Sequence, residues 1–265
     1  MNIISKILCA VGLLGAVGGG ITLGVGACQG GNFKRGVIED ESNLNIHADS
    51  FDVSEMPSSI NIDMSVGDIR LYTSTNDRLT ITHKTYEKQN TISISGSTVY
   101  VKSKGDNPFN WSLTNMFSKY MGGSNSLSIF VPDWYSNRIN INLGAGKIRS
   151  EVYFLTPILD FKNSAGSIEI VNAIQTNKMK LEASAGDIDM NLEDLRDITE
   201  IDYVTYDLKV SAGSINVKMP DNDLTYYVDA DVSVGNRVVE GDGVKEDSKI
   251  RINADVTAGN IKITK

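Results

Sequence analysis

The chain has 265 residues and a formal net charge of −8; 22% of its residues are charged and 41% are hydrophobic. This composition excludes a disordered polymer and a protein embedded wholly in a membrane, and it leaves room for one large folded domain. Because no stripe of Lys and Arg offsets the acidic excess, we expect no direct binding of nucleic acid or anionic lipid.

The first segment of the chain is predicted to be a membrane anchor. Residues 1–6 are expected to form a short cytoplasmic N-terminus, and residues 7–27 (ILCAVGLLGAVGGGITLGVGA) contain no charged side chain. At about 1.5 Å per helical residue, this run spans about 31 Å, which matches the hydrocarbon core of a bilayer. A cleavable signal peptide has a shorter apolar run and a more basic start. We therefore predict one transmembrane helix over residues 7–27, with the lipid bilayer as its partner; Gly15 and Gly19 would also allow it to dimerise.

Cys28 offers an alternative kind of anchor. Residues 25–28 (VGAC) are similar to the small-residue pattern that precedes the lipidated cysteine of bacterial lipoproteins. The length of the apolar run and the single basic residue before it, Lys6, favour the permanent helix, although both forms tether the protein to a membrane. The only other cysteine is Cys9, so we expect no disulfide framework in the rest of the chain.

Residues 28–53 are predicted to be a juxtamembrane linker followed by a first strand, and residues 54–265 a domain of β-strand repeats. Seven segments of this domain share one pattern, in which a glycine lies between two stretches of alternating apolar residues. The seven glycines are Gly67, Gly146, Gly166, Gly186, Gly213, Gly235 and Gly259. From Gly146 onward they are 20, 20, 27, 22 and 24 residues apart, a period typical of repeats that bury a core by stacking on one another.

The apolar residues lie at odd distances along the chain before each glycine and at even distances after it; we call this change a change of parity. In the unit around Gly186 they lie seven, five and three residues before it and two and four residues after it: Met179, Leu181, Ala183, Ile188 and Met190. Alternation of this kind is typical of a strand with one buried face. Both strands can point inward only if the glycine forms a corner, and glycine suits a corner because it tolerates positive φ and a close neighbouring chain.

We therefore predict an all-β fold, a mostly parallel β-solenoid with the seven glycines stacked along one corner edge. In that arrangement Ile168, Ile188 and Ile215 form one column. The alternative is a two-sheet β-sandwich of antiparallel hairpins, because the repeats before Gly146 are irregular and Gly67 and Gly146 are 79 residues apart.

The segment 104–126 (KGDNPFNWSLTNMFSKYMGGSNS) departs from the repeat. In a chain that is only 7% aromatic, it is rich in aromatic and methionine side chains, among them Trp111, Met116, Phe117, Tyr120 and Met121. Helical spacing within the segment predicts a short amphipathic helix that ends at the glycine pair 122–123. This helix either covers an open end or side of the solenoid or presents an apolar patch to a partner, which makes the segment our candidate partner-binding loop.

Several of these segments together resemble a known family. They are the anchor with its glycine-rich exit (residues 30–32), the stretches SSINIDMSVGDIRLYTSTNDRLTITH and SLSIFVPDWYSNRININLGAGKI, and the later S-A-G-[DS]-I units. The family is that of membrane-tethered putative adhesins built from β-strand repeats, which is common in Gram-positive bacteria and includes the LiaG-like proteins linked to cell-envelope stress operons. The resemblance covers about residues 54–265 and implies a cytoplasmic N-terminus and an extracellular repeat domain. No catalytic residue carries over from it.

The sequence contains no recognisable motif for catalysis, a metal or a cofactor, so we expect a protein that is not an enzyme. The two histidines, His47 and His83, are 36 residues apart and fit no metal-binding spacing. Asp187 and Asp189 alternate with apolar residues, which places their carboxylates on the solvent side of a strand and not in a cleft. An enzyme that acts on polysaccharides is therefore the weakest alternative.

The sequence favours a membrane-anchored cell-surface protein, either a putative adhesin or a module that interacts with the cell envelope. Its expected partners are the bilayer and a surface or envelope ligand that the sequence does not identify. The alternative is an accessory component of a cell-envelope stress response that acts on a membrane partner through its helix or through the 104–126 loop.

Overall fold

The computed structural model of the chain describes residues 45–51, 57–75, 78–85, 90–103, 126–132, 135–152, 156–172, 176–195, 203–221, 224–240 and 248–265. Within these ranges all regular secondary structure is β, and thirteen strands are linked by hydrogen bonds into one sheet. No helix in the described ranges could span a membrane. Outside these ranges lie the predicted transmembrane segment 7–27, Cys28, and the loop residues Trp111, Met116, Phe117, Tyr120 and Met121.

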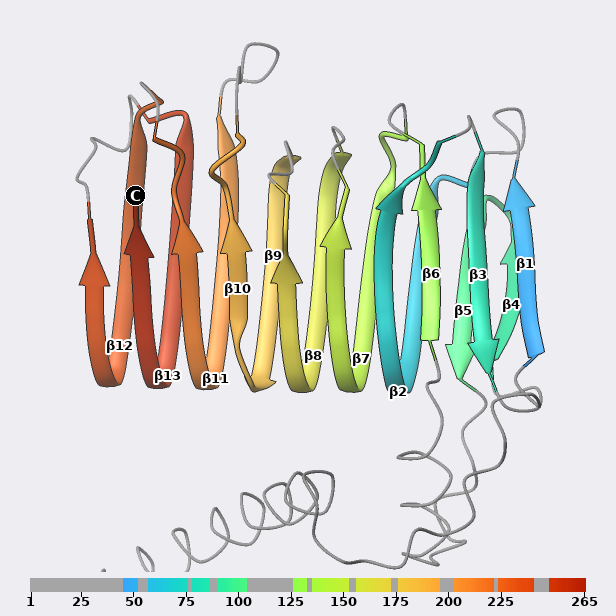
Figure 1. The fold of residues 1–265 in the computed structure, drawn as a ribbon, viewed down its shortest axis with the longest axis horizontal. Helices are drawn as coiled ribbons and strands as arrows, with labels where there is room; N and C mark the ends of the chain where they lie inside the picture. Colours follow the sequence, from blue (N-terminus) through green and yellow to red (C-terminus); the bar gives the residue numbers. More distant parts are fainter. Residues whose placement is uncertain are drawn as a thin grey trace, which may run out of the picture. The chain divides into compact units, whose positions relative to one another are not determined.

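Each long strand bends at its glycine and so contributes two arms. Six strands run through the bend without a break: β2 (Ser59–Thr73), β7 (Arg138–Glu151), β8 (Thr156–Ile170), β11 (Val204–Lys218), β12 (Tyr226–Val239) and β13 (Ile250–Thr264). In the unit of Gly186 the arms are separate strands, β9 (Thr176–Ala185) and β10 (Ile188–Asn191). The arms before the glycines form the first-arm sheet and the arms after them the second-arm sheet, and the two layers meet along the corner edge at the bottom of Figure 1.

The units stack in parallel and in register at their glycines. The pairs include Gly67–Gly146, Gly146–Gly166, Gly213–Gly259 and Gly259–Gly235. Ile188 pairs with both Ile168 and Ile215, so the predicted column of isoleucines is present. The prediction of a parallel β-solenoid is confirmed, and the alternative of a sandwich of antiparallel hairpins is wrong for these units.

The order of the units in space follows the sequence with one exception. β13 lies between β11 and β12, so β12 forms the end of the stack (Figure 1). Among the described strands, β12 pairs with β13 alone. The repeat pattern does not predict this exchange, because the units of Gly235 and Gly259 present the same glycine corner to a neighbour.

The strands between Gly67 and Gly146, together with β1 (Asn45–Phe51) before them, extend the two layers separately. In the first-arm sheet, β5 (Thr98–Ser103) pairs in parallel with β2, and β4 (Asn90–Ser95) pairs antiparallel with β5. In the second-arm sheet, β6 (Ser126–Val131) pairs in parallel with β2, and the antiparallel strands β3 (Leu79–Thr85) and β1 follow. The irregular spacing of the first two glycines therefore reflects strands that belong to one layer only.

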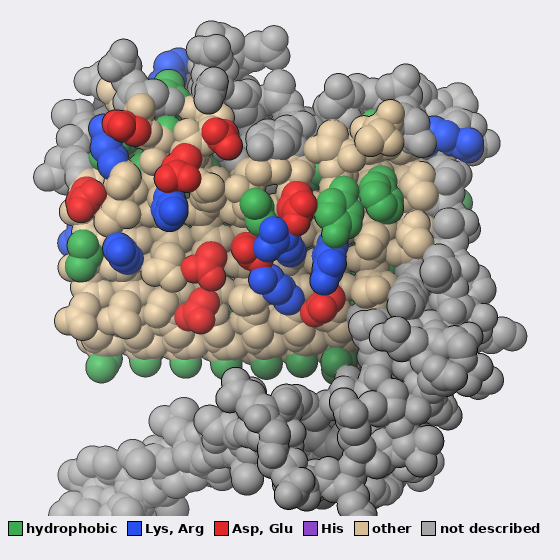
Figure 2. Space-filling view, in the orientation of Figure 1, with side chains coloured by type: hydrophobic (Ala, Val, Ile, Leu, Met, Phe, Trp, Pro, Cys, Tyr) green, Lys and Arg blue, Asp and Glu red, His purple; other side chains and the backbone are tan. Residues whose placement is uncertain are grey.

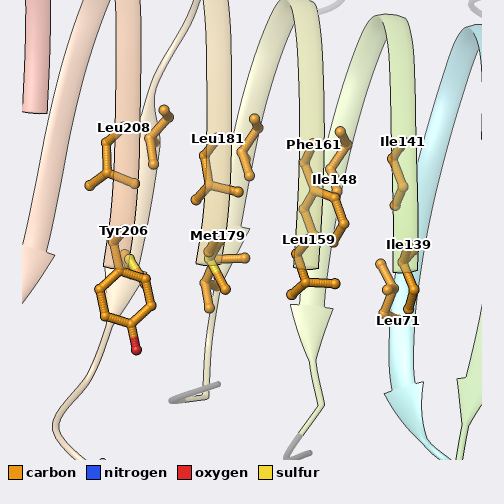
Figure 3. Packing of buried hydrophobic residues seen from close by; sticks show 14 of the residues in the cluster. Leu71, Ile139, Ile141, Ile148, Leu159, Phe161, Met179, Leu181, Tyr206 and Leu208 are labelled. Atoms are coloured by element: carbon orange, nitrogen blue, oxygen red, sulfur yellow. The ribbon is translucent and has the colours of Figure 1, made fainter. Parts of the chain in front are cut away.

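The core lies between the two layers and consists of the alternating residues that the sequence parity predicts. Leu159, Phe161, Met179 and Leu181 of the first arms are fully buried, and Figure 3 shows them at the same two levels in consecutive units. Ile188 of the second arms is also fully buried. Burial of a side chain of this size contributes about 1.5–3 kcal/mol relative to exposure. Because this core forms between units, a single unit has no core of its own.

The corner requires glycine for two reasons. The φ angles of the seven corner glycines lie between 127° and 147°, a region that other residues rarely adopt. In addition, a Cβ atom on Gly186 would overlap the backbone carbonyl oxygen of Gly166 in the neighbouring unit. The corner also accommodates a buried polar side chain, because Asn163 Nδ2 donates a hydrogen bond to the carbonyl oxygen of Gly146 at 2.8 Å.

We predict that Gly186→Val lowers the free energy of unfolding by about 3 kcal/mol or more, because it combines a strained φ with an overlap that the stacked backbone cannot relieve. Urea unfolding of the full-length protein, followed by circular dichroism, measures this loss. Gly96→Ala is the control: Gly96 has a φ of 60°, but an added Cβ would meet nothing within 4 Å. The control should lose only about 1–2 kcal/mol. Equal losses in the two variants would contradict the role of the overlap.

Candidate ligand-binding face

The structure locates some of the predicted site residues and not others. The seven corner glycines come together along one edge, where they shape the backbone. The aromatic and methionine residues of the 104–126 loop lie outside the described residues, so this binding site stays a prediction. Asp187 and Asp189 are exposed, as their parity indicates. In the described part of the chain, no three His, Cys, Asp or Glu side chains are grouped so that they could hold a metal ion.

The outward side chains of the first-arm sheet form two rows that cross the strands. In the long units, the first row takes the residue six positions before each glycine and the second row the residue four positions before it. Strand pairing gives the first row as Tyr100, Asn61, Asn140, Asp160, Lys180, Asp207, Asn253 and Asp229. The second row is Lys102, Asp63, Asn142, Lys162, Glu182, Lys209, Asp255 and Asp231.

In the part of these rows that lies toward β13, charged side chains form ion pairs with one another. Lys180 Nζ lies 2.7 Å from Glu182 Oε1 on the same strand, and Lys178 Nζ lies 3.0 Å from Asp207 Oδ2 on the next strand. The hydrogen bond from Lys180 lowers the pKa of the Glu182 carboxyl and outweighs the opposing effect of burial. Glu182 is therefore charged at neutral pH. The ion pairs offset part of the charge in this half of the face, where Glu182 and four aspartates outnumber the lysines.

Toward β5, the rows change from ion pairs to amides. The face is hollowed here into a shallow, open depression of about 370 Å³, the amide groove, lined by Asn61, Ile62, Asp63, Tyr100, Lys102, Asn140, Ile141, Asn142, Asp160 and Lys162. Asn140 Nδ2 donates to Asn61 Oδ1 at 2.6 Å, and Asn142 Nδ2 donates to Asp63 Oδ1 at 3.3 Å. These hydrogen bonds link β7 to β2 through side chains, in addition to the backbone ladder.

The amide groove is hidden when the sequence is read in chain order, because Asn61 and Asn140 are 79 residues apart. A signal exists once the units are aligned on their glycines, since Asn61, Asn140 and Asp160 each precede a glycine by six positions. Tyr100 has no such marker, because β5 has no glycine corner. Only its pairing with Asn61 across β5 and β2 brings Tyr100 into the groove.

The second-arm sheet, which faces the viewer in Figures 1 and 2, carries a compact cluster of ion pairs. Glu169 of β8 contacts Lys147 Nζ and lies 2.7 Å from Arg149 Nη1, and both basic residues belong to β7. Figure 2 shows basic and acidic side chains gathered in the middle of this face. Tyr72 and Phe130 stack near the cluster, with their ring centroids 5.4 Å apart.

The second-arm cluster links neighbouring units electrostatically. Burial alone would raise the pKa of Glu169, but hydrogen bonds from Lys147 and Arg149 outweigh it and hold that pKa below its ordinary value. The hydrogen bond to Glu151 is the main cause of the raised pKa of Arg149. Both partners are thus firmly charged at neutral pH, so this cluster stabilises the stack and supplies no group that is ready to exchange a proton.

Comparison with known proteins places the chain in a family. The model of the Toastrack DUF4097 family matches residues 57–265, and the chain therefore belongs to that family. No curated protein matches the chain. A solved structure of a putative cell adhesion protein from Clostridium sporogenes is similar with a TM-score of 0.52 and 15% identity, over 83% of this chain and 99% of that one. A putative adhesin from Bacteroides fragilis has a TM-score of 0.46 and 13% identity, over 83% of this chain and 97% of that one. At 15% identity, the likeness to the first structure shows a shared fold alone.

We predict that Glu169→Gln lowers the free energy of unfolding at about pH 7 by at most about 1 kcal/mol, because it removes the charge that pairs with Lys147 and Arg149 in a partly exposed cluster. The folded-state pKa of Glu169 is lowered, so its contribution is present above the unfolded-state pKa and is lost as the pH falls through the folded-state pKa. In urea unfolding, the difference between the variant and the wild type should therefore be present at about pH 7 and vanish at an acidic pH below the folded-state pKa of Glu169.

Glu193→Gln is the matched control for this measurement. Lys218 Nζ lies 3.9 Å from Glu193 Oε1, and both side chains are more than half exposed. The control should change stability by only a few tenths of a kcal/mol at either pH. A loss in Glu169→Gln that persists undiminished at low pH would show that the ion pairs are not its cause.

Proposed function

We propose that this member of the Toastrack DUF4097 family is a non-enzymatic, membrane-anchored protein of the cell surface that binds a component of the cell envelope. The amide groove supports this proposal best, because it is an open depression lined mainly by polar residues on a sheet whose inner face is buried. Catalysis relies on groups that are shielded from water and aimed at one reacting atom. A shallow groove with several similar polar groups suits the binding of an extended ligand instead.

Three further observations agree with this role. The Clostridium sporogenes protein of the same fold is named a putative cell adhesion protein. A stack of repeats also presents a long surface that holds its shape, which suits extended partners. The uncharged run of residues 7–27 would hold this surface at a membrane.

A second candidate function is an accessory role in a cell-envelope stress response, exerted on a membrane partner. The aromatic and methionine side chains of the 104–126 loop favour this candidate, because such side chains are enriched in protein–protein interfaces. The two candidates differ in the ligand: an external envelope component in the first, and a membrane protein in the second.

We predict that the full-length protein fractionates with membranes, resists extraction by high salt, and retains residues 1–27 in mass spectrometry, because residues 7–27 are long enough to span a bilayer. Cys28→Ala should leave this fractionation unchanged. A diacylglycerol on an N-terminal Cys28 would show that the alternative anchor is the real one. Protease added to intact cells should cleave the repeat domain, and full protection would contradict a surface location.

We predict that the double variant Trp111→Ala, Phe117→Ala loses a partner that the wild type captures after crosslinking in cells, because large aromatic side chains dominate many binding interfaces. Mass spectrometry of the captured material separates the two candidate functions: loss of a membrane protein favours the accessory role, and loss of an envelope component favours adhesion. Ile94→Ser is the control, since Ile94 is 62% exposed but lies outside the loop. Unchanged capture by the double variant would remove the loop from consideration as a binding site.

A further inference from the structure

We propose that the amide groove binds an uncharged carbohydrate, a β-1,4-linked chain of acetamido sugars, laid across β5, β2, β7 and β8. This inference rests on the proposed surface-binding function and names its ligand. Four properties of the groove point to such a ligand: its charge, its hydrogen-bonding groups, its aromatic ring and the geometry of its sheet.

The charge of the groove favours a neutral ligand. Its lining contains two aspartates, Asp63 and Asp160, and two lysines, Lys102 and Lys162. The groove is therefore locally neutral on a chain whose formal net charge is −8. An anionic ligand would lie against the two carboxylates, and a cationic ligand would lie against the two ammonium groups.

The hydrogen-bonding groups of the groove are suited to hydroxyl and amide groups. An asparagine side chain has two N–H donors and an acceptor oxygen. Asn140 and Asn142 each use one donor on β2, at Asn61 and Asp63 respectively, so each has capacity left at the surface. Hydroxyl and acetamido groups both donate and accept, which matches such a surface.

Tyr100 supplies an aromatic ring at one end of the amide row. The side chain is half-buried, and its backbone lies next to Asn61 in the strand ladder. A pyranose ring whose substituents are all equatorial has two apolar faces, and an aromatic ring is a suitable partner for such a face. Lys102 Nζ lies 5.7 Å from the centroid of the Tyr100 ring, and this exposed contact is weak enough for a ligand to displace it.

The sheet geometry favours a chain of sugars over a peptide. Neighbouring strands lie about 4.8 Å apart, so the four strands of the groove extend over about 14 Å. The first arms of β2, β7 and β8 are paired on both sides, which prevents a peptide from joining this part of the sheet as an added strand. The buried residues beneath hold the polar groups in place, so little conformational freedom is lost when a ligand binds.

Isothermal titration calorimetry on the full-length protein in lipid nanodiscs tests the proposal. The probe is the β-1,4-linked hexamer of N-acetylglucosamine, and a hexamer of galacturonic acid is the anionic control. We expect the neutral hexamer to bind and the anionic one not to bind. Tyr100→Ala should weaken binding of the neutral hexamer about ten-fold, and Asn142→Ala should weaken it several-fold, while Tyr100→Phe should retain it because the ring remains.

Two matched variants separate the groove from the rest of the surface. Asn253→Ala removes the same kind of side-chain hydrogen bond on the same face, where Asn253 Nδ2 donates to Asp207 Oδ1 at 2.6 Å outside the groove. Asn216→Ala does so on the second-arm sheet, where Asn216 Nδ2 donates to Asp189 Oδ1 at 2.8 Å. Both should bind the hexamer like the wild type. Circular dichroism and thermal unfolding confirm that each variant is folded before its affinity is compared.

The outcomes distinguish this inference from the proposed function. Loss of binding in Tyr100→Ala and Asn142→Ala, with retention in Tyr100→Phe, Asn253→Ala and Asn216→Ala, supports the groove as the carbohydrate site. Binding that is unaffected by Tyr100→Ala overturns the assignment of the groove. Absence of hexamer binding in a wild-type protein that still captures an envelope component from cells overturns the carbohydrate and leaves the proposed function standing. Absence of both overturns the two together.

Discussion

The stack depends on one steric constraint, the close contact between six of the seven corner glycines, all but Gly67, and the carbonyl oxygen of a glycine in the adjacent unit. A Cβ atom has no space at Gly186 or at Gly259, because it would overlap the backbone of Gly166 or Gly213. The units can therefore approach only in the register that places glycine beside glycine. This register decides which side chains enter the core, because a slip of one residue would exchange the inward and outward faces of a unit.

The same register makes neighbouring units depend on each other's polar side chains. Residues at equal distances from their glycines become direct neighbours, as Arg70 and Arg149 do. Like charges side by side are unfavourable, and Arg149 is compensated by Glu151 and Glu169. Asparagines at equivalent positions of adjacent units avoid this repulsion, because they carry no charge and one amide can donate a hydrogen bond to its neighbour and still accept one from another group. Amide rows thus leave part of the surface neutral and available to a ligand.

Parity around the glycines was enough to predict the corner, the inward residues and the parallel stack, because each of these follows from local geometry. The sequence could not predict that β13 enters between β11 and β12, since that choice depends on which equivalent surfaces fit best. Nor could it predict the amide groove, which joins Tyr100 of a strand without a corner to Asn61 and Asn140 of two distant units. The hydrophobic pattern determines which residues of each strand face inward. Which outward side chains lie next to one another depends on how distant strands pair, so a site on the outer face cannot be predicted from one strand alone.

The position of β13 also has a consequence for the biosynthesis of the protein. The stack from β2 to β11 can assemble in the order in which a ribosome or an export channel releases the chain. Residues 226–239 emerge next, yet among the described strands their pairing partner is β13, which follows them in the chain. The edge of β11 that receives β13 therefore stays open until residues 250–264 have been made. A chain that ended before residue 250 would lack β13, and β12 would then have no pairing partner among the described strands. The loss of one strand would thus remove two units from the stack.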